Sequence, residues 1–222
     1  QIFNMDAFDK ACARVAGLMD ELRRETGAVL PELNLGGGFG IKYLPEHDPV
    51  QYDRYMQRVA GAVERTCKAR GLRTPFIVIE PGRSIVGPAG LTLYTAGAVK
   101  EIPGVRTYLS VDGGMGDNPR YILYQAPYEA MVANRAAEPK TRTVTLAGRC
   151  CESGDLIGEH MQMQEARAGD IIAVLATGAY NYAMASNYNR IPRPPVVMLR
   201  EGRARVVVRR ESYEDLVRND ED

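Results

Sequence analysis

Apolar residues recur at three- and four-residue steps near the start of the chain, which is the spacing of one face of an α-helix. Gly27 follows this run and is a typical C-terminal stop. The pattern predicts an amphipathic helix from Asp6 to about Glu25, with an apolar face formed by Phe8, Cys12, Val15, Leu18, Met19 and Leu22.

A second helical pattern lies between residues 48 and 71. Asp48 is a candidate N-cap, Pro49 suits the first helical position, and Gly71 closes the pattern. The predicted helix has an apolar face formed by Val50, Met56, Val59, Val63 and Cys67. Cys12 of the first helix and Cys67 of the second are both expected to be buried in the protein core.

Two short apolar runs, 33–35 and 76–80, each lead directly into a glycine-containing turn. They are predicted to be buried strands, and their alternation with the helices indicates a parallel sheet covered by helices. In such folds ligands lie beyond the carboxyl ends of the strands. The turns "GGGFG" and "EPGRS" therefore occupy candidate site positions.

Beyond about residue 90 the helical period gives way to short β-rich runs separated by Gly, Pro and Asp. The sequence thus predicts an α/β part over residues 1–88 and a mainly β domain over residues 89–222, with a short helix from Tyr213 to about Arg218. Its strands are expected in "LTLYTAGAVKEI", "RTYLSVDGG", "TRTVTLAGRCC", "DIIAVLATGAY" and "PPVVMLREGRARVVVRRE".

The α/β part holds only two strand-and-turn units, and the first residue is Gln1. An open two-stranded parallel sheet leaves exposed edges, and an eight-unit barrel needs about 250 residues. We therefore expect the chain to be the later part of a longer polypeptide, cut near Gln1.

Composition narrows the functional classes. The 222 residues are 45% hydrophobic and 25% charged, and Lys plus Arg equals Asp plus Glu at 28 each. Such a balance favours neither nucleic acid nor a membrane as partner, and no stretch has the length of a membrane span. Four cysteines without a signal peptide or CxxC spacing indicate reduced thiols and a cytoplasmic location.

The two turns suggest anion chemistry. In "GGGFG", backbone amides can approach a phosphate because no Cβ intervenes; the alternative is a tight turn without a ligand. In "EPGRS", Glu80 could pair with a cationic ring nitrogen and Arg83 could hold a phosphate or carboxylate. The alternative there is a Glu80–Arg83 ion pair that only stiffens the turn.

Side chains alternate in a strand, so a strand continuing to residue 151 would place Cys150 towards the core and Cys151 on the other face. Adjacent cysteines and the isolated His47 and His160 make a metal site improbable. A thiol acid or base at Cys151, beside Glu152, remains.

Five segments in order, "LNLGGGFG", "IEPGRSIVG", "DGGMGDNPR", "CESGD" and "TGAYNYAMASNYN", resemble the diaminopimelate decarboxylase family of pyridoxal phosphate enzymes over nearly the whole chain. The resemblance implies the last part of a cofactor-binding (β/α)8 barrel followed by a C-terminal β-sandwich or barrel-like domain. It also implies pyridoxal 5'-phosphate, a homodimer with shared active sites, and association with the N-terminal half of the same enzyme.

The resemblance further implies residue roles. Cys151 would be the proton donor, and Glu80 would face the pyridine nitrogen. Cofactor contacts would come from Gly36, Gly37, Gly38, Glu80, Pro81, Gly82, Arg83 and Tyr180. Substrate contacts would come from Arg83, Arg120, Tyr124, Glu152 and Tyr180.

In that family the lysine that links the cofactor lies in the N-terminal half, so this chain alone is expected to be inactive. None of its lysines stands in the expected strand context: Lys10, Lys42, Lys68, Lys100 and Lys140. The reaction expected of the parent enzyme is decarboxylation of meso-diaminopimelate to L-lysine. The alternatives are a related ornithine, arginine or carboxynorspermidine decarboxylase, a cofactor-binding homologue without catalysis, and a purely structural β-domain.

Overall fold

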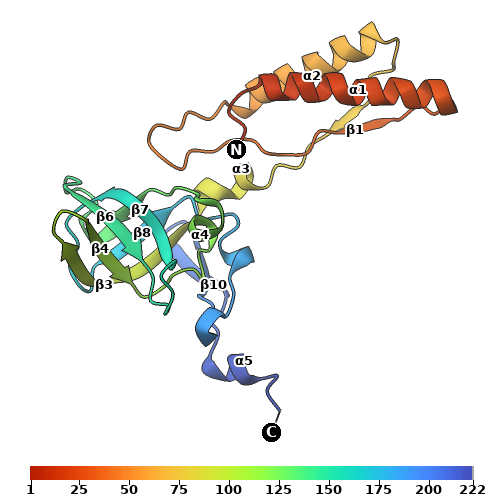
Figure 1. Ribbon diagram of the computed structural model, residues 1–222. Helices are drawn as coiled ribbons and strands as arrows, with labels where there is room; N and C mark the ends of the chain where they lie inside the picture. Colours follow the sequence, from red (N-terminus) through yellow and green to blue (C-terminus); the bar gives the residue numbers. More distant parts are fainter. Residues whose placement is uncertain (222) are drawn as a thin grey trace. The chain divides into compact units, whose positions relative to one another are not determined.

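A computed structural model describes residues 1–221, and the chain divides into two compact units. The first unit comprises residues 1–42 and 46–87, and the second comprises residues 43–45 together with those from 88 onward (Figure 1). No helix within residues 1–221 is long and apolar enough to cross a membrane.

The first unit pairs two long helices with two short strands (Figure 1). Its elements are α1 (Asp6–Thr26), β1 (Glu32–Asn34), α2 (Tyr52–Ala69), β2 (Phe76–Val78) and the short α3 (Arg83–Val86). Helix α1 ends at Gly27 in a left-handed conformation, as the sequence predicts. Strands β1 and β2 are parallel, with Leu33 opposite Ile77, which confirms the predicted parallel pairing.

Helix α2 begins at Tyr52, so the prediction of an N-cap at Asp48 is wrong. Gln51 is extended, with ψ of 147°, and this conformation separates Pro49 from the helix. Val50 packs against the aromatic cluster of Phe8, Phe39 and Tyr55. This tertiary contact places the segment outside the helix, and the fixed φ of proline suits an extended chain as well as a first turn.

Within residues 1–221, one face of the β1–β2 pair is covered by helices and the other is not. Leu33 and Ile77 pack with Cys12, Val63 and Cys67 of the helices, so both cysteines are core residues as predicted. The other face is open, since 75% of Phe76 is exposed. The prediction that 76–80 is a buried strand is therefore wrong, because alternate side chains of the strand point away from α1 and α2, which cover the opposite face.

The second unit contains the predicted β-rich runs and two strands that the sequence did not indicate. Its strands are β3 (Leu91–Ile102), β4 (Arg106–Val111), β5 (Ala130–Val132), β6 (Arg142–Ala147), β7 (Leu156–Met163), β8 (Ile171–Leu175), β9 (Val196–Arg200) and β10 (Arg203–Val208). Strands β5 and β7 were not predicted, because β5 is short and β7 contains glycine, glutamine and methionine. Short helical segments are η1 (Gly87–Ala89), α4 (Arg120–Tyr124), η2 (Ala133–Arg135), η3 (Tyr182–Met184), η4 (Tyr188–Arg190) and α5 (Tyr213–Val217), the last as predicted.

Six strands form one sheet in the order β5-β8-β3-β4-β6-β7, antiparallel except for the β4–β6 pair. Its two edges meet, because the side-chain oxygen of Gln164, just after β7, accepts a hydrogen bond from the Val132 amide of β5 at 3.0 Å. The sheet is therefore a nearly closed barrel. Its interior holds buried side chains such as Leu109, Val132, Val144, Leu146, Ile157, Met163, Ile172 and Val174.

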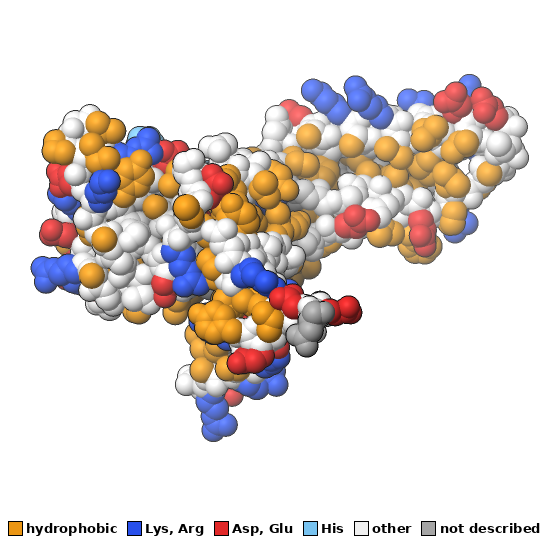
Figure 2. Space-filling view, turned by 60° about the horizontal axis from the view of Figure 1, so that its bottom comes forward, with side chains coloured by type: hydrophobic (Ala, Val, Ile, Leu, Met, Phe, Trp, Pro, Cys, Tyr) orange, Lys and Arg blue, Asp and Glu red, His pale blue; other side chains and the backbone are white. Residues whose placement is uncertain are grey.

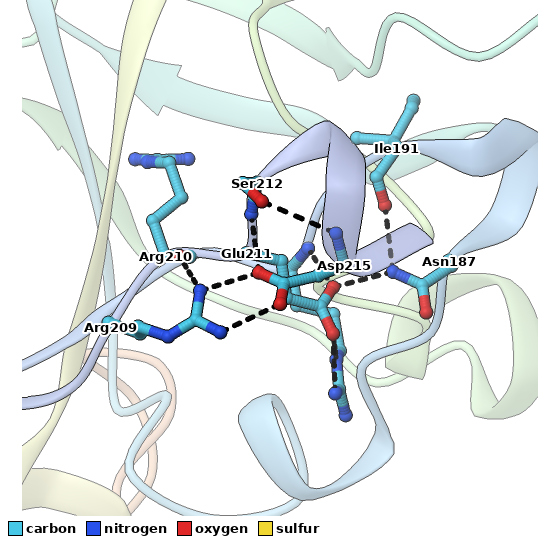
Figure 3. A network of polar contacts seen from close by, with 8 residues as sticks. Asn187, Ile191, Arg209, Arg210, Glu211, Ser212 and Asp215 are labelled. Atoms are coloured by element: carbon cyan, nitrogen blue, oxygen red, sulfur yellow. Dashed lines mark hydrogen bonds and ion pairs between the residues drawn. The ribbon is translucent and has the colours of Figure 1, made fainter. Parts of the chain in front are cut away.

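Strands β9 and β10 form a separate antiparallel hairpin, and a polar network lies beside its C-terminal end (Figure 3). Glu211 accepts hydrogen bonds from the Arg193 amide at 2.8 Å and from its guanidinium at 2.6 and 2.8 Å, and from Asn187 at 2.6 Å. Ser212 and Asp215 form a capping box at α5. The network ties the segment around Asn187 to the end of the chain.

The same contacts lower the pKa of Glu211 to about 2, first through the hydrogen bond from the Arg193 side chain. Since the pKa of a glutamate in an unfolded chain is about 4.3, Glu211 stabilises the fold fully above that pH and less as the pH falls towards its lowered pKa of about 2. We expect Glu211→Gln to lower the unfolding free energy at neutral pH. The difference in unfolding free energy between the variant and the wild type should narrow below about pH 4.

Urea unfolding of both proteins at a series of pH values measures that gap. Glu201→Gln, at an exposed turn position with a weakly held side chain, is the control and should show little change at any pH. A gap of constant size from neutral to acid pH would contradict the role assigned to Glu211.

Candidate functional site

The glycine turn after β1 lies directly against the turn after β2. Gly36 and Gly38 have φ of 71° and 87°, a left-handed backbone that favours glycine. A Cβ on Gly37 would overlap the carbonyl oxygen of Glu80. The Glu80 amide donates to the Gly36 carbonyl at 2.7 Å, so the two predicted site turns are joined backbone to backbone.

Asn34 couples these turns through its side chain. Its amide nitrogen donates to the Glu80 carboxylate at 2.7 Å, and its oxygen accepts from the Gly36 amide at 2.8 Å. One side chain therefore orients the carboxylate and shapes the start of the glycine turn. Asn34 is a site residue that sequence reasoning missed, although it stands inside the quoted "LNLGGGFG".

Pro81 and Gly82 continue from Glu80 and lead into α3, whose first residue is Arg83. Gly82 is exposed, and Arg83 is half-buried. The structure thus gathers the glycine turn, Glu80 and the "PGR" turn within the first unit. A left-handed glycine turn suits an anionic phosphate, and an exposed carboxylate suits a protonated ring nitrogen, so these residues fit pyridoxal phosphate.

In the second unit the predicted residues Arg120 and Tyr180 lie close together. The Arg120 side chain is buried, with the residue only 6% exposed. Its Nη1 donates to the hydroxyls of Tyr43 and Tyr128, both at 2.9 Å. Its guanidinium carbon also lies 5.7 Å from the ring centroid of Tyr180, a cation–π distance. Tyr43 and Tyr128 are further residues that the sequence analysis did not single out.

Helix α4 carries Arg120 and is anchored by the neighbouring Tyr121. The Tyr121 hydroxyl donates to Glu159 of β7 at 2.6 Å, and Glu159 also pairs with Arg106 of β4. Burial, followed by the hydrogen bond to Glu159, raises the pKa of Tyr121 to about 12. Tyr124, at the other end of the helix, is exposed at 62%. The anchor therefore fixes one predicted substrate residue in the interior and leaves the other at the surface.

Cys151 and Glu152 lie in a loop rather than in a strand. Strand β6 ends at Ala147, so Cys150 and Cys151 do not lie in a strand. Strand alternation therefore cannot assign them to opposite faces, and that part of the prediction is wrong. Cys150 is nevertheless half-buried and Cys151 is exposed. Burial, followed by the nearby Asp155 carboxylate, raises the pKa of Cys150 to about 11 and keeps it a neutral thiol.

Asp155 sets the shape of this loop. The carboxylate is buried, with the residue 3% exposed, and it accepts hydrogen bonds from the amides of Met115 at 2.6 Å and Cys150 at 2.7 Å. A Cβ on Gly114 or Gly148 would overlap this carboxylate, so both positions need glycine. Asp155 therefore joins the "DGGMGD" turn to the loop of Cys151. It closes the quoted "CESGD", but sequence reasoning gave it no role.

Glu152 lies at the surface of the same loop. The Tyr188 hydroxyl donates to its carboxylate at 3.4 Å. Tyr180 belongs to the same tyrosine-rich segment as Tyr188 and has a left-handed φ of 66°. Within the second unit the predicted residues thus fall into two groups. In one, Arg120 is buried and the neighbouring Tyr180 is 43% exposed, and in the other, Cys151 and Glu152 are both exposed.

The chain is similar to known pyridoxal-dependent decarboxylases in sequence and in fold. Residues 1–87 match the family model described as the pyridoxal-binding domain of pyridoxal-dependent decarboxylases. The diaminopimelate decarboxylases of Bacillus subtilis and Halalkalibacterium halodurans are each 50% identical to the chain over 220 residues, which is 99% of the chain and 50% of each relative. The chain belongs to the diaminopimelate decarboxylase family. It spans about half the length of these relatives.

Solved structures of diaminopimelate decarboxylases are also similar to this chain. The enzyme of M. jannaschii in complex with L-lysine superposes with a TM-score of 0.90 at 29% identity, over 100% of this chain and 50% of that one. The enzyme of Helicobacter pylori with L-lysine gives a TM-score of 0.84 at 30% identity, over 98% and 51%. The fold of both units therefore matches the corresponding part of those enzymes.

The buried Asp155 leads to a stability prediction. Asp155→Asn replaces one acceptor oxygen with a donor that faces a backbone N–H, so we expect a loss of about 1–3 kcal/mol in unfolding free energy. Urea unfolding at neutral pH measures it. Glu138→Gln, at an exposed position of the same unit, is the control. A loss no larger than that of the control would show that Asp155 does not hold the two loops together.

Proposed function

We propose that the chain is the C-terminal half of an enzyme that decarboxylates meso-2,6-diaminopimelate at its D-centre to L-lysine and carbon dioxide. The observation that carries the proposal is 50% identity to diaminopimelate decarboxylases over 99% of the chain. The grouping of the predicted residues around Glu80, Arg120 and Cys151 supports it. Below, the complete enzyme means this chain joined to the N-terminal half that such relatives carry.

In this proposal the first unit holds pyridoxal 5'-phosphate. Gly36, Gly37, Gly38, Gly82 and Arg83 hold its phosphate, with Pro81 shaping the turn and Tyr180 against the cofactor. Glu80 keeps the ring nitrogen protonated, in the orientation that Asn34 sets through its 2.7 Å hydrogen bond. When bound, the cofactor accepts the electrons left as carbon dioxide departs. The lysine that links the cofactor belongs to the other half of the enzyme.

Arginines and tyrosines would bind the substrate. Arg83, Arg120 and Tyr124 hold carboxylates, Tyr180 lies beside the substrate, and Glu152 receives the distal ammonium. A buried arginine favours a substrate with a second carboxylate, because a substrate that ends in an amine alone would bring a second cation to the site. This charge argument favours diaminopimelate over ornithine, arginine or carboxynorspermidine.

Cys151 would deliver a proton from Sγ to the carbon that has lost carbon dioxide. It is the exposed cysteine of the pair, whereas Cys150 has its pKa raised to about 11 and is half-buried beside Asp155. We further propose a homodimer in which Cys151 and Glu152 complete the site of the partner subunit. The exposure of both residues supports this assignment, since a group shared across an interface must reach the surface.

The complete enzyme should release carbon dioxide from meso-diaminopimelate with a kcat/KM at least about a hundredfold above that for ornithine, arginine or carboxynorspermidine, because binding carboxylates at a buried cation discriminates strongly. Chromatography of the products of each substrate tests this. Preferred turnover of a substrate without the second carboxylate would contradict the proposed specificity, and no turnover of any would contradict the proposed activity.

Cys151→Ala in the complete enzyme should bind pyridoxal phosphate normally but lose roughly 10²- to 10⁴-fold in kcat, the usual contribution of proton transfer. Absorbance of the bound cofactor and steady-state kinetics measure the two effects. Cys150→Ala is the matched control and should keep most of the activity. Wild-type turnover in Cys151→Ala would remove Cys151 from the mechanism.

Mixed dimers separate a shared site from a self-contained one. Mixing Cys151→Ala subunits with Glu80→Ala subunits should restore roughly a quarter of wild-type activity, because half of the dimers are mixed and each has one intact site. Absence of any recovery after verified subunit exchange would place Cys151 and Glu80 in the site of one subunit.

A further inference from the structure

We infer that Tyr128, assisted by Tyr43, is a positioning residue that fixes the guanidinium of Arg120 in the orientation that receives a substrate carboxylate. The inference rests on the proposed function, which assigns Arg120 to carboxylate binding. The inference adds Tyr43 and Tyr128 to the candidate site, although neither needs to contact the substrate. It also explains why the Arg120 guanidinium is held by phenol hydroxyls rather than by a carboxylate.

The hydrogen bonds have a fixed direction. A guanidinium can only donate, so the Tyr43 and Tyr128 oxygens are acceptors of the two bonds from Nη1, both 2.9 Å long. The hydrogen of Tyr128 then points elsewhere, and the hydroxyl donates to Oδ1 of Asn181 at 3.2 Å. Asn181 thereby orients the Tyr128 hydroxyl as an acceptor, and Tyr128 orients Arg120.

Aromatic rings complete the enclosure. The Arg120 guanidinium carbon lies 5.4, 5.8 and 5.7 Å from the ring centroids of Tyr43, Tyr128 and Tyr180. Tyr43 and Tyr128 contact each other edge to face, with centroids 5.3 Å apart and planes at 90°. Such a cage holds a planar cation by shape and by the negative faces of the rings. It adds no charge that would compete with a ligand.

Arg120 differs from other arginines of its unit that lie near carboxylates within residues 1–221. The less buried Arg106, Arg135 and Arg193 each pair with a carboxylate of the chain. Among the described residues no carboxylate forms a salt bridge with Arg120, although it is only 6% exposed. A buried cation held by neutral groups retains its attraction for an external anion, whereas an internal carboxylate would already have neutralised it.

Tyr128→Phe in the complete enzyme tests the inference. The variant keeps the ring and removes only the acceptor, so we expect KM for diaminopimelate to rise about tenfold, as for loss of a hydrogen bond to a charged group, with kcat within about threefold. Tyr43→Phe should act in the same direction. The matched control is Tyr94→Phe, which removes a hydroxyl from a residue that is also buried, at 4% exposure, in the same unit.

Binding without turnover separates this inference from the proposed function. L-Lysine and its diamine analogue cadaverine are titrated calorimetrically into wild-type and Tyr128→Phe enzyme. The dissociation constant of lysine should rise about tenfold and that of cadaverine should stay within twofold, because only lysine has a carboxylate for Arg120.

The outcomes are distinct. Equal effects on lysine and cadaverine, a fall in kcat at unchanged KM, or kinetics like those of Tyr94→Phe would each overturn the positioning role. A lysine-specific loss in an enzyme that does not decarboxylate diaminopimelate would uphold Tyr128 and overturn only the proposed reaction. Wild-type enzyme that binds no lysine would overturn the inference itself.

Discussion

The second unit depends on one buried carboxylate. Asp155 accepts hydrogen bonds from the amides of Met115 and Cys150, and in this way joins the turn that precedes α4 to the loop of Cys151. A carboxylate without a cationic partner is stable in the interior only when N–H groups saturate it. Gly114 and Gly148 make that approach possible, because a Cβ at either position would overlap the carboxylate.

The charged side chains of this unit have different kinds of partners. Glu211 and Arg193 neutralise each other at the C-terminal network, and Arg106 and Glu159 do so beside α4. These ion pairs hold neighbouring segments of the unit together. On the surface, apolar side chains are interspersed with charged ones (Figure 2). Within residues 1–221, the partners of Arg120 are instead phenol hydroxyls and aromatic rings. Its positive charge is therefore left for a group outside the described chain, which is the electrostatic condition of a binding residue.

Local pattern predicted much of the fold. The periodicity of α1, the parallel pairing of β1 with β2 and the capped α5 all follow from short-range rules. Strand β7 and the start of α2 depend on tertiary contacts, namely pairing across the barrel and the packing of Val50. A single sequence contains no direct sign of such contacts, so these boundaries were missed or misplaced.

The candidate site divides in the same way. Motifs singled out Glu80, Arg120 and Cys151 as candidates, because these residues stand in recognisable runs of the sequence. Asn34, Tyr128 and Asp155 orient their surroundings through hydrogen bonds, and each of the three bonds a residue in a distant segment of the chain. Their types, an amide, a phenol and a carboxylate, are common at surfaces. Burial marks Tyr128 and Asp155 as structural, whereas the exposed Asn34 is marked only by its two hydrogen bonds. The candidate site therefore consists of residues that motifs identify and of residues that hold them in place. The second group can be recognised only in the folded structure, because its members come from distant parts of the chain.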